Sequence, residues 1–162
     1  MGSDFYTMSI LPYAAIIVKI CRAYTNTQTD FEDYYQEVCL QIWRSKDNFN
    51  GHSQWSTWVY KISLNVCLTY LKKSKNNTLV SDSLPEEVVA DSQASIGEHA
   101  IAQLYACIRQ LSEVDRAVIL LYLEEKTYQE ISDIIGTSPN NIGVRIARIK
   151  ARLNKLLQLE DN

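Results

Sequence analysis

Apolar residues along this chain recur at intervals of three and four, which is the period of an α-helix that buries one face. Strict alternation of apolar and polar residues, the pattern of a half-buried β-strand, is rare, and the 162 residues include only 5 glycines and 3 prolines. The pattern therefore predicts an all-α protein. The predicted helices lie near residues 9–25, 30–45, 54–73, 100–110 and 113–123, with two shorter ones within residues 128–153.

The first two predicted helices differ in how much polar surface they carry. The expected inward-facing set of the first helix is Leu11, Ala14, Ile17, Val18 and Cys21. Asp30 is the expected N-cap of the second helix, since a short polar side chain can accept from an unpaired N–H group there. The second helix also has a polar face, which plain contact with solvent would explain. That face carries Asp33, Gln36, Glu37, Gln41 and Arg44.

Residues 74–99 interrupt the helical pattern. The segment is rich in serine and asparagine, contains Pro85, and has five acidic side chains against one basic one. Such a composition is typical of a linker with little structure of its own. We therefore expect two small helical domains, residues 1–73 and 100–160, joined by a flexible acidic linker, with four helices in the second domain.

Within the second domain, the start and stop signals of two consecutive helices are unusually complete. Thr127 followed by Glu130 forms a capping-box pattern, and Gly136 can end the helix in a left-handed conformation. Ser138 can cap the next helix, with Pro139 at its first position. Two short helices joined by a glycine-containing turn are typical of a helix-turn-helix.

The second of these helices has an apolar stripe and a basic remainder. Its stripe is Ile142, Ile146, Ile149 and Leu153, and residues 138–157 contain five basic side chains and no acidic one, although the net charge of the chain is −3. This local charge favours a DNA-binding helix-turn-helix. The alternative is an ordinary helical hairpin whose basic face is only solvated.

An aromatic and basic cluster in the predicted helix 54–73 indicates a second nucleic-acid contact. Trp55, Trp58 and Tyr60 lie close to Lys61 in the sequence, and two further lysines follow at positions 72 and 73. Bases of single-stranded nucleic acid stack on aromatic rings, while lysines follow the backbone. The alternative is that the tryptophans belong to the core.

Other chemistries have little support. The cysteines at 21, 39, 67 and 107 show no CxxC spacing and fit the apolar helix faces, so we expect buried thiols in a reducing cytoplasm. The two histidines lie apart, and no phosphate-binding glycine loop is present. We expect no catalytic site, no cofactor and no metal. The apolar run at residues 10–18 is too short to span a bilayer, so we expect no membrane insertion.

Three segments together resemble the bacterial sigma factors of the sigma-70 family, specifically the extracytoplasmic-function (ECF) branch. They are DFEDYYQEVCLQIW, FNGHSQWSTWVYKISLNVCLTYLKK and LSEVDRAVILLYLEEKTYQEISDIIGTSPNNIGVRIARIKARL, in that order. The resemblance implies a two-domain transcription initiation factor that brings RNA polymerase core to promoters and works in the cytoplasm, at the nucleoid when active. A stand-alone helix-turn-helix repressor or activator and a helical interaction module are the alternatives.

The resemblance also assigns roles in the first domain. It implies contact with the clamp coiled coil of the polymerase's largest subunit through Asp33, Gln36, Glu37 and Gln41, with Arg44 as a weaker candidate. The block that reads and melts the −10 element, and captures an unpaired base, maps to Phe49, Asn50, His52, Ser53, Trp58, Tyr60, Lys61 and Asn65. Further expected partners are the polymerase flap region and an anti-sigma factor.

In the second domain the resemblance implies reading of the −35 element by the basic helix. With the isoleucines facing inward, Asn140 and Val144 lie on the opposite face, flanked by Asn141 and Arg145. We predict sequence readout by these four residues, because Asn can bond an adenine edge at two points. The predicted phosphate contacts are Arg148, Lys150 and Arg152, with Arg145 near either backbone or base. The family often has a basic residue where Gly143 stands, which puts that contact in doubt.

Overall fold

The structure, a computed structural model, describes residues 3–77 and 96–160. Within these ranges all regular secondary structure is helical, which confirms the all-α prediction. The chain divides into two compact units, Met1–Ala90 and Asp91–Asn162, each of which we consider by itself. The central part of the predicted flexible acidic linker, residues 78–95, lies outside the described residues.

The first unit begins with a helical path that changes pitch. Its elements are α1 (Ser3–Phe5), the π-helical turn η1 (Tyr6–Ile10), the 3-10 turn η2 (Leu11–Tyr13) and α2 (Ala14–Ala23). The sequence predicted one regular helix over residues 9–25, which is wrong at its start. Pro12 supplies a physical reason, because it has no N–H to donate and its ring disfavours a continuous α-helix.

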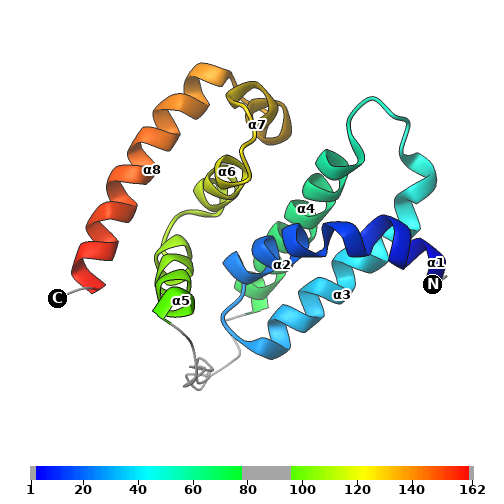
Figure 1. The fold of residues 1–162 in the computed structure, drawn as a ribbon, viewed down its shortest axis with the longest axis horizontal. Helices are drawn as coiled ribbons and strands as arrows, with labels where there is room; N and C mark the ends of the chain where they lie inside the picture. Colours follow the sequence, from blue (N-terminus) through cyan, green and yellow to red (C-terminus); the bar gives the residue numbers. More distant parts are fainter. Residues whose placement is uncertain (1–2, 78–95, 161–162) are drawn as a thin grey trace. The chain divides into compact units, whose positions relative to one another are not determined.

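Two longer helices complete the first unit. They are α3 (Gln28–Ser45), extended by the 3-10 turn η3 (Lys46–Asn48), and α4 (Trp55–Asn77). The helices α2, α3 and α4 contact one another pairwise, and their arrangement can be followed in Figure 1. Thr27 rather than Asp30 caps α3, since the Thr27 hydroxyl accepts the Asp30 N–H at 3.1 Å. The helix therefore begins earlier than predicted, and Asp30 lies in its first turn.

The core of the first unit lies between these three helices. Ile17, Cys21, Val38 and Ile42 have no exposed surface. Two residues of the expected inward set are instead on the surface, since Leu11 is 50% and Val18 37% exposed. Within the regular helix α2, Ile17, Ile20 and Cys21 share one face, and Val18 lies outside it. Leu11 lies in the 3-10 turn η2, where the buried position is taken by the preceding Ile10.

By length and composition alone, the helical run Tyr6–Ala23 is apolar enough to cross a membrane. Its mean hydropathy is 1.2, and it lies near the N-terminus. The run also supplies Ile10, Ile17 and Ile20 to the core of the first unit, where all three are at most 1% exposed. Packing in the unit therefore accounts for these three isoleucines, whereas Met8 and Leu11 of the same run are exposed.

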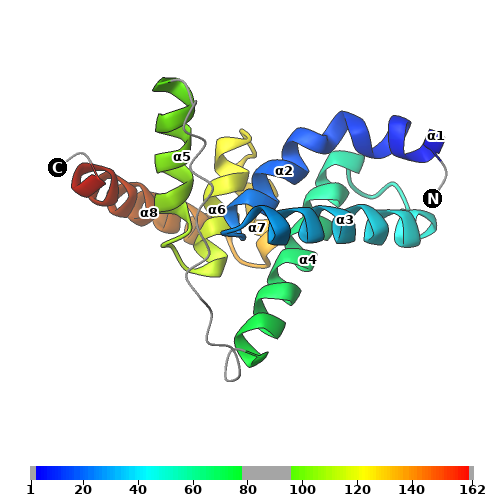
Figure 2. The ribbon, with the colours of Figure 1, turned by 90° about the horizontal axis from the view of Figure 1, so that it is seen from below.

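Between residues 96 and 160 the second unit contains four helices, as predicted. They are α5 (Ile96–Ile108), α6 (Glu113–Leu123), α7 (Tyr128–Ile135) and α8 (Pro139–Glu160). The long helix α8 contacts each of the other three, and Figure 2 shows it extending beyond them at its C-terminal end. Both ends of the stretch assigned to the linker are helical, because α4 continues to Asn77 and α5 begins at Ile96.

Candidate nucleic-acid interface

The turn between α7 and α8 has the geometry that its sequence predicts. The Thr127 hydroxyl accepts the Glu130 N–H at 3.1 Å, and a Glu130 carboxylate oxygen accepts the Thr127 N–H at 3.2 Å. These bonds, first of all the one from the Thr127 backbone, lower the pKa of Glu130. Gly136 has φ +89° and ends α7, and the Ser138 hydroxyl accepts the Asn141 N–H at 3.2 Å. The predicted helix-turn-helix is confirmed at each of these positions.

Helix α8 is divided into a buried and an exposed face. Ile142, Ile146, Ile149 and Leu153 are at most 7% exposed, which confirms the predicted stripe. On the opposite face Val144 is 50% exposed and Asn140 is exposed. The helix therefore has a rigid apolar backing and an open polar face, which is the arrangement required of a helix that enters a groove.

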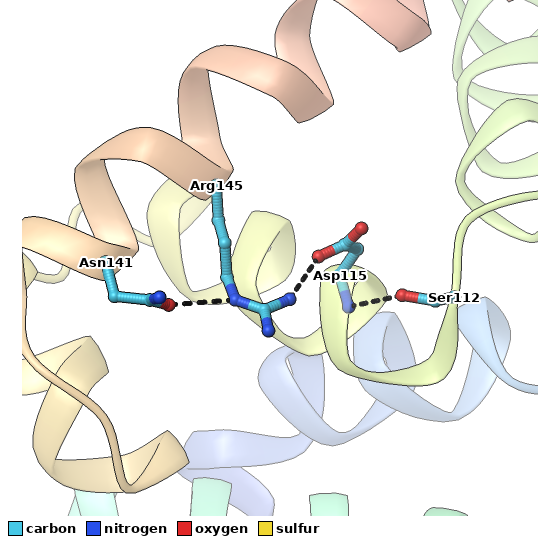
Figure 3. Close-up of polar contacts among 4 residues, drawn as sticks. All are labelled: Ser112, Asp115, Asn141 and Arg145. Carbon is cyan, nitrogen blue, oxygen red and sulfur yellow. Dashed lines mark hydrogen bonds and ion pairs between the residues drawn. The ribbon is translucent and has the colours of Figure 1, made fainter.

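One flank of α8 is tied to α6 and to the turn before it. Arg145 donates from Nε to the Asn141 side-chain oxygen and from Nη1 to a carboxylate oxygen of Asp115, both at 2.9 Å (Figure 3). Arg152 donates from Nη2 to the Gln110 carbonyl oxygen at 3.3 Å. Both arginines thus have partners inside their own unit.

The other flank of α8 packs against two tyrosines. Lys150 donates to the Tyr122 hydroxyl at 2.6 Å, and its Nζ lies 4.4 Å from the centre of that ring. The hydrogen bond raises the pKa of Lys150. A Cβ placed on Gly143 would lie 3.4 Å from a ring carbon of Tyr128. The Tyr128 ring therefore covers the position at which the family often has a basic side chain.

Arg148 differs from the other basic residues predicted to contact phosphate. It is exposed, and within residues 3–77 and 96–160 it makes no hydrogen bond, ion pair or ring contact. Its guanidinium is available without breaking a contact, whereas Lys150 and Arg152 each have one donor already engaged.

The aromatic residues near the start of α4 form a cluster of rings. The ring centres of Phe49, Trp55 and Trp58 lie 5.0–5.4 Å apart, and Phe5 lies 6.3 Å from Trp55. Phe49, Trp55 and Trp58 are all half-buried in this cluster, so these two tryptophans are neither core residues nor fully exposed rings. The rings hold the loop in place through T-shaped and tilted packing.

The expectation that Tyr60 is a surface residue of α4 is wrong, because it is only 2% exposed. It directly follows Val59, and α2 and α3 both pack on α4, so the buried face is wide enough to include it. Asn50 and His52 are exposed on the loop, while Ser53 and Lys61 are half-buried. The polar loop residues are therefore the accessible part of this predicted group.

Asn65 is exposed but lies apart from the loop. It is ten residues beyond Trp55 on α4, which corresponds to about 15 Å along a helix. It lines a groove of about 330 Å³ between α3 and α4, together with Glu37, Gln41 and Tyr70. The structure thus places Asn65 with the predicted polymerase-binding residues.

The polar face of α3 borders this groove. Gln41 donates to Glu37 at 3.0 Å, and both are half-buried, while Asp33 and Gln36 are exposed and line an adjoining hollow of about 540 Å³. Burial and the carboxylates of Glu37 and Asp33 raise the pKa of the Tyr70 hydroxyl. All four predicted polymerase-binding residues therefore line two adjoining hollows, which share Glu37, Tyr70 and Lys73 and together form a groove along α3 and α4.

The cysteines lie in the cores of the two units. Cys21, Cys39, Cys67 and Cys107 are all buried and free of disulfides, as predicted. Burial raises the pKa of Cys39 to about 11, and a hydrogen bond with Cys21 raises that of Cys67. Over residues 3–77 and 96–160, no three His, Cys, Asp or Glu side chains gather as metal ligands would.

Two family profiles match this chain over most of its length. The profile described as Sigma-70 region 2 matches residues 10–77, and the one described as Sigma-70, region 4 matches residues 101–153. The chain belongs to the sigma-70 family. Region 2 covers α2, α3 and α4, and region 4 covers most of α5 together with α6, α7 and the first two thirds of α8.

Individual members of the sigma-70 family are similar to most of this chain. The ECF RNA polymerase sigma factor SigG of Mycobacterium tuberculosis is 28% identical over 170 residues, which cover 88% of this chain and 46% of SigG. SigW of Bacillus subtilis is 26% identical over 165 residues, covering 90% of this chain and 85% of SigW. The chain spans about half the length of SigG.

A solved structure has the same fold. It is described as the sigma factor RpoE in complex with the anti-sigma factor NepR from Bartonella quintana. The TM-score is 0.79 at 23% sequence identity, with 97% of this chain and 98% of that chain covered. The likeness identifies the fold, which agrees with the sigma-70 assignment.

Sequence reasoning does not identify the residues that contact α8 from elsewhere in its unit. Ser112 and Asp115 have the spacing of a helix cap, in which the Asp115 N–H donates to the Ser112 hydroxyl at 3.2 Å, but this spacing does not signal the contact with Arg145. No spacing marks Tyr122 or Tyr128 as a neighbour of α8. Each contact joins α8 to a residue at least 15 positions away, and no local spacing signals such a pair.

Proposed function

We propose that this chain is a transcription initiation factor of the ECF type, which binds RNA polymerase core and directs it to promoters. The observation that carries the proposal is the combination of an isoleucine-backed basic helix in one unit with a polar groove along α3 and α4 in the other. We also propose that the chain acts by binding alone, in the cytoplasm and at the nucleoid when active.

The first unit is the part that binds core polymerase and opens DNA. Asp33, Gln36, Glu37 and Gln41 contact the clamp coiled coil of the largest subunit, and their common groove gives that helix pair a place to lie. Asn50, His52, Ser53 and Lys61 meet the −10 element, while the rings of Phe49 and Trp58 set the shape of the loop. Tyr60 has no part in this contact, since it is buried.

The second unit reads duplex DNA at the −35 element while the polymerase flap region supports it. Asn140, Asn141, Val144 and Arg145 face the base edges, and Arg148 takes a phosphate. Lys150 and Arg152 also take phosphates without losing their present bonds, because an ammonium has three donors and a guanidinium has five.

A stand-alone repressor or activator explains the helix-turn-helix but gives no use for the groove along α3 and α4. We further propose that an anti-sigma factor binds the chain. One similar structure is described as the sigma factor RpoE in complex with the anti-sigma factor NepR, and another as CnrH in complex with the cytosolic domain of CnrY.

The test is association with purified core polymerase, followed by transcription from genomic fragments. Two charge reversals one residue apart make a matched pair, because Asp33 lines the groove and Glu32 does not. Asp33→Lys should weaken core association at least about 10-fold, while Glu32→Lys should change it less than about 2-fold. Equal effects, or tight duplex binding by the free chain with no core association, would contradict the proposal.

A further inference from the structure

The Arg145 side chain is held from two sides before any DNA is present. Asp115 accepts from Nη1 and Asn141 accepts from Nε, both at 2.9 Å, and the three residues form one chain of contacts (Figure 3). A guanidinium is planar and carries its donors at fixed angles. Two bonds to different nitrogens therefore fix its plane as well as its position.

Asp115 is itself held firmly where it meets Arg145. Its backbone N–H is bonded to the Ser112 hydroxyl in the first turn of α6, which fixes the backbone from which the carboxylate extends. The Asp115 side chain is 29% exposed and that of Arg145 is 39% exposed. The ion pair is thus partly shielded from solvent, while the far side of the guanidinium remains accessible.

Several hydrogen-bonding groups of Arg145 and Asn141 remain without a partner in this cluster. Arg145 has five N–H donors, of which two are engaged, so both donors of Nη2 and one of Nη1 remain. The Asn141 oxygen already accepts from Nε, whereas its Nδ2 has no partner within the described residues. The pair therefore offers mainly donors to an incoming ligand, with the second lone pair of the Asn141 oxygen as its one remaining acceptor.

We propose that Asp115 is a positioning residue for duplex readout, which clamps Arg145 beside Asn141 so that the pair donates to the acceptor edge of a guanine. This inference rests on the proposed function. Guanine presents two acceptors, O6 and N7, in the major groove, whereas adenine presents one acceptor and one donor. The Asn141 oxygen that accepts from Arg145 has one lone pair left, and the guanidinium lies beside it, so the clamped pair is better suited to guanine than to the two-point bond with adenine that its sequence position predicted.

The test compares substitutions that separate the clamp from its charge. Asp115→Ala removes the acceptor oxygens and the charge, whereas Asp115→Asn removes the charge and keeps an acceptor in the same place. Asp133→Ala removes an equal charge from α7, where Asp133 accepts from Gln129 and does not touch Arg145. None of these changes disturbs the backbone bond of Asp115 to Ser112.

The measurement is binding of the complete holoenzyme to a promoter library with each base at every −35 position. We expect the wild-type chain to prefer guanine over adenine at one or more positions. Asp115→Ala should reduce that preference about 10-fold, whereas Asp115→Asn and Asp133→Ala should change it less than about 3-fold. Adding Asp115→Ala to an Arg145→Ala variant should have no further effect on preference.

A second readout concerns the free chain and does not need polymerase. The Arg145 Nε–H should exchange with solvent several-fold faster in Asp115→Ala than in wild type, as seen by NMR, with backbone amides of α8 unchanged. Equal exchange rates of the Arg145 Nε–H in Asp115→Ala and wild type would contradict the proposal that Asp115 holds Arg145 in place.

Other outcomes would also overturn the inference. Equal weakening of all promoter sequences with a changed salt slope would mean that Arg145 meets phosphate. If Asp115→Ala also reduced the guanine preference in the Arg145→Ala background, Asp115 would act through residues other than Arg145. If the wild-type chain neither binds core polymerase nor selects promoters, the proposed function itself fails, which the core association measurement distinguishes.

Discussion

Trp55 donates its indole Nε1–H to the backbone carbonyl oxygen of Ser9 at 2.8 Å, across 46 positions of sequence. The bond joins the π-helical turn η1 to the first residue of α4. The Phe5 ring adds edge contacts with Trp43 at 5.2 Å and with Trp55 at 6.3 Å. The N-terminal segment therefore supports the loop that carries the proposed −10 contacts.

Replacing this indole by a phenyl ring should destabilise the first unit. Trp55→Phe keeps an aromatic ring in the cluster but leaves the Ser9 carbonyl without its partner, which costs about 1 kcal/mol of unfolding free energy. This loss of unfolding free energy is measured by urea unfolding, with hydrogen exchange of the α4 amides as the probe. Trp58→Phe is the matched control, because its indole N–H has no hydrogen bond within the described residues. Equal losses in the two variants would show that ring size alone is responsible.

The helix-turn-helix could be predicted because its determinants are local. Each of its four capping and turn residues bonds a backbone group within five positions, so their spacing in the sequence predicts the geometry of the turn. These residues are Thr127, Glu130, Gly136 and Ser138. The isoleucine stripe of α8 follows from helical period in the same way. On the polar face of α3, Asp33 and Gln36 are exposed, whereas Glu37 and Gln41 are half-buried in a groove that depends on α4.

Other features depend on contacts that sequence spacing does not contain. Tyr60 is buried because two helices pack on α4, and Arg145 is paired with a carboxylate 30 positions away. Glu125 ends α6 with φ +63° in a Schellman turn, in which the Lys126 N–H bonds the Leu121 carbonyl at 3.1 Å. A non-glycine residue at such a position gives no sequence signal.

Two glycines of the helix-turn-helix should respond oppositely to alanine. Gly143 lies within α8, where alanine is favoured by about 1 kcal/mol, and the new Cβ would meet only the half-exposed Tyr128 ring at 3.4 Å. Gly143→Ala should therefore stabilise the second unit. Gly136 has φ +89°, so Gly136→Ala should destabilise it by about 1–2 kcal/mol. Amide exchange in α7 and α8 measures both. Destabilisation by Gly143→Ala would mean that the Tyr128 ring cannot move to accommodate the new Cβ.

Alanine substitutions of two arginines of α8 should differ in their effect on stability, although both weaken DNA binding. Arg148 has no partner in the described parts of the chain, so Arg148→Ala should weaken all promoters about equally and lower the salt slope by about 1. It should leave the unfolding free energy within about 0.5 kcal/mol. Salt titrations of holoenzyme binding measure the slope, and a promoter-selective effect would contradict the phosphate role.

Arg152 provides the contrasting case. Its Nη2 donates to the Gln110 carbonyl oxygen, where α5 turns into α6, so its removal leaves that carbonyl dependent on solvent. Arg152→Ala should cost about 1 kcal/mol in stability as well as weakening DNA binding. Thermal unfolding monitored at the amides of α5 and α6 distinguishes the two variants. Equal stability of Arg148→Ala and Arg152→Ala would show that the long bond of 3.3 Å contributes nothing.

The capping box of α7 should make that helix sensitive to acid. The pKa of Glu130 is lowered in the folded chain by its bonds with Thr127, so its contribution to stability is present above the unfolded value of about 4.3 and is lost as the pH falls through the folded value. Because the side chain is 45% exposed, solvent screening limits the effect to about 0.5 kcal/mol.

Glu130→Gln keeps an acceptor oxygen but cannot titrate. The protection of α7 amides against hydrogen exchange, corrected for intrinsic rates, should therefore fall more between about pH 5 and pH 3 in wild type than in Glu130→Gln. Glu125→Gln, which removes an equal charge outside the capping box, should follow the wild-type curve. Parallel curves for wild type and Glu130→Gln would show that the carboxylate charge gives the cap no advantage over a neutral amide.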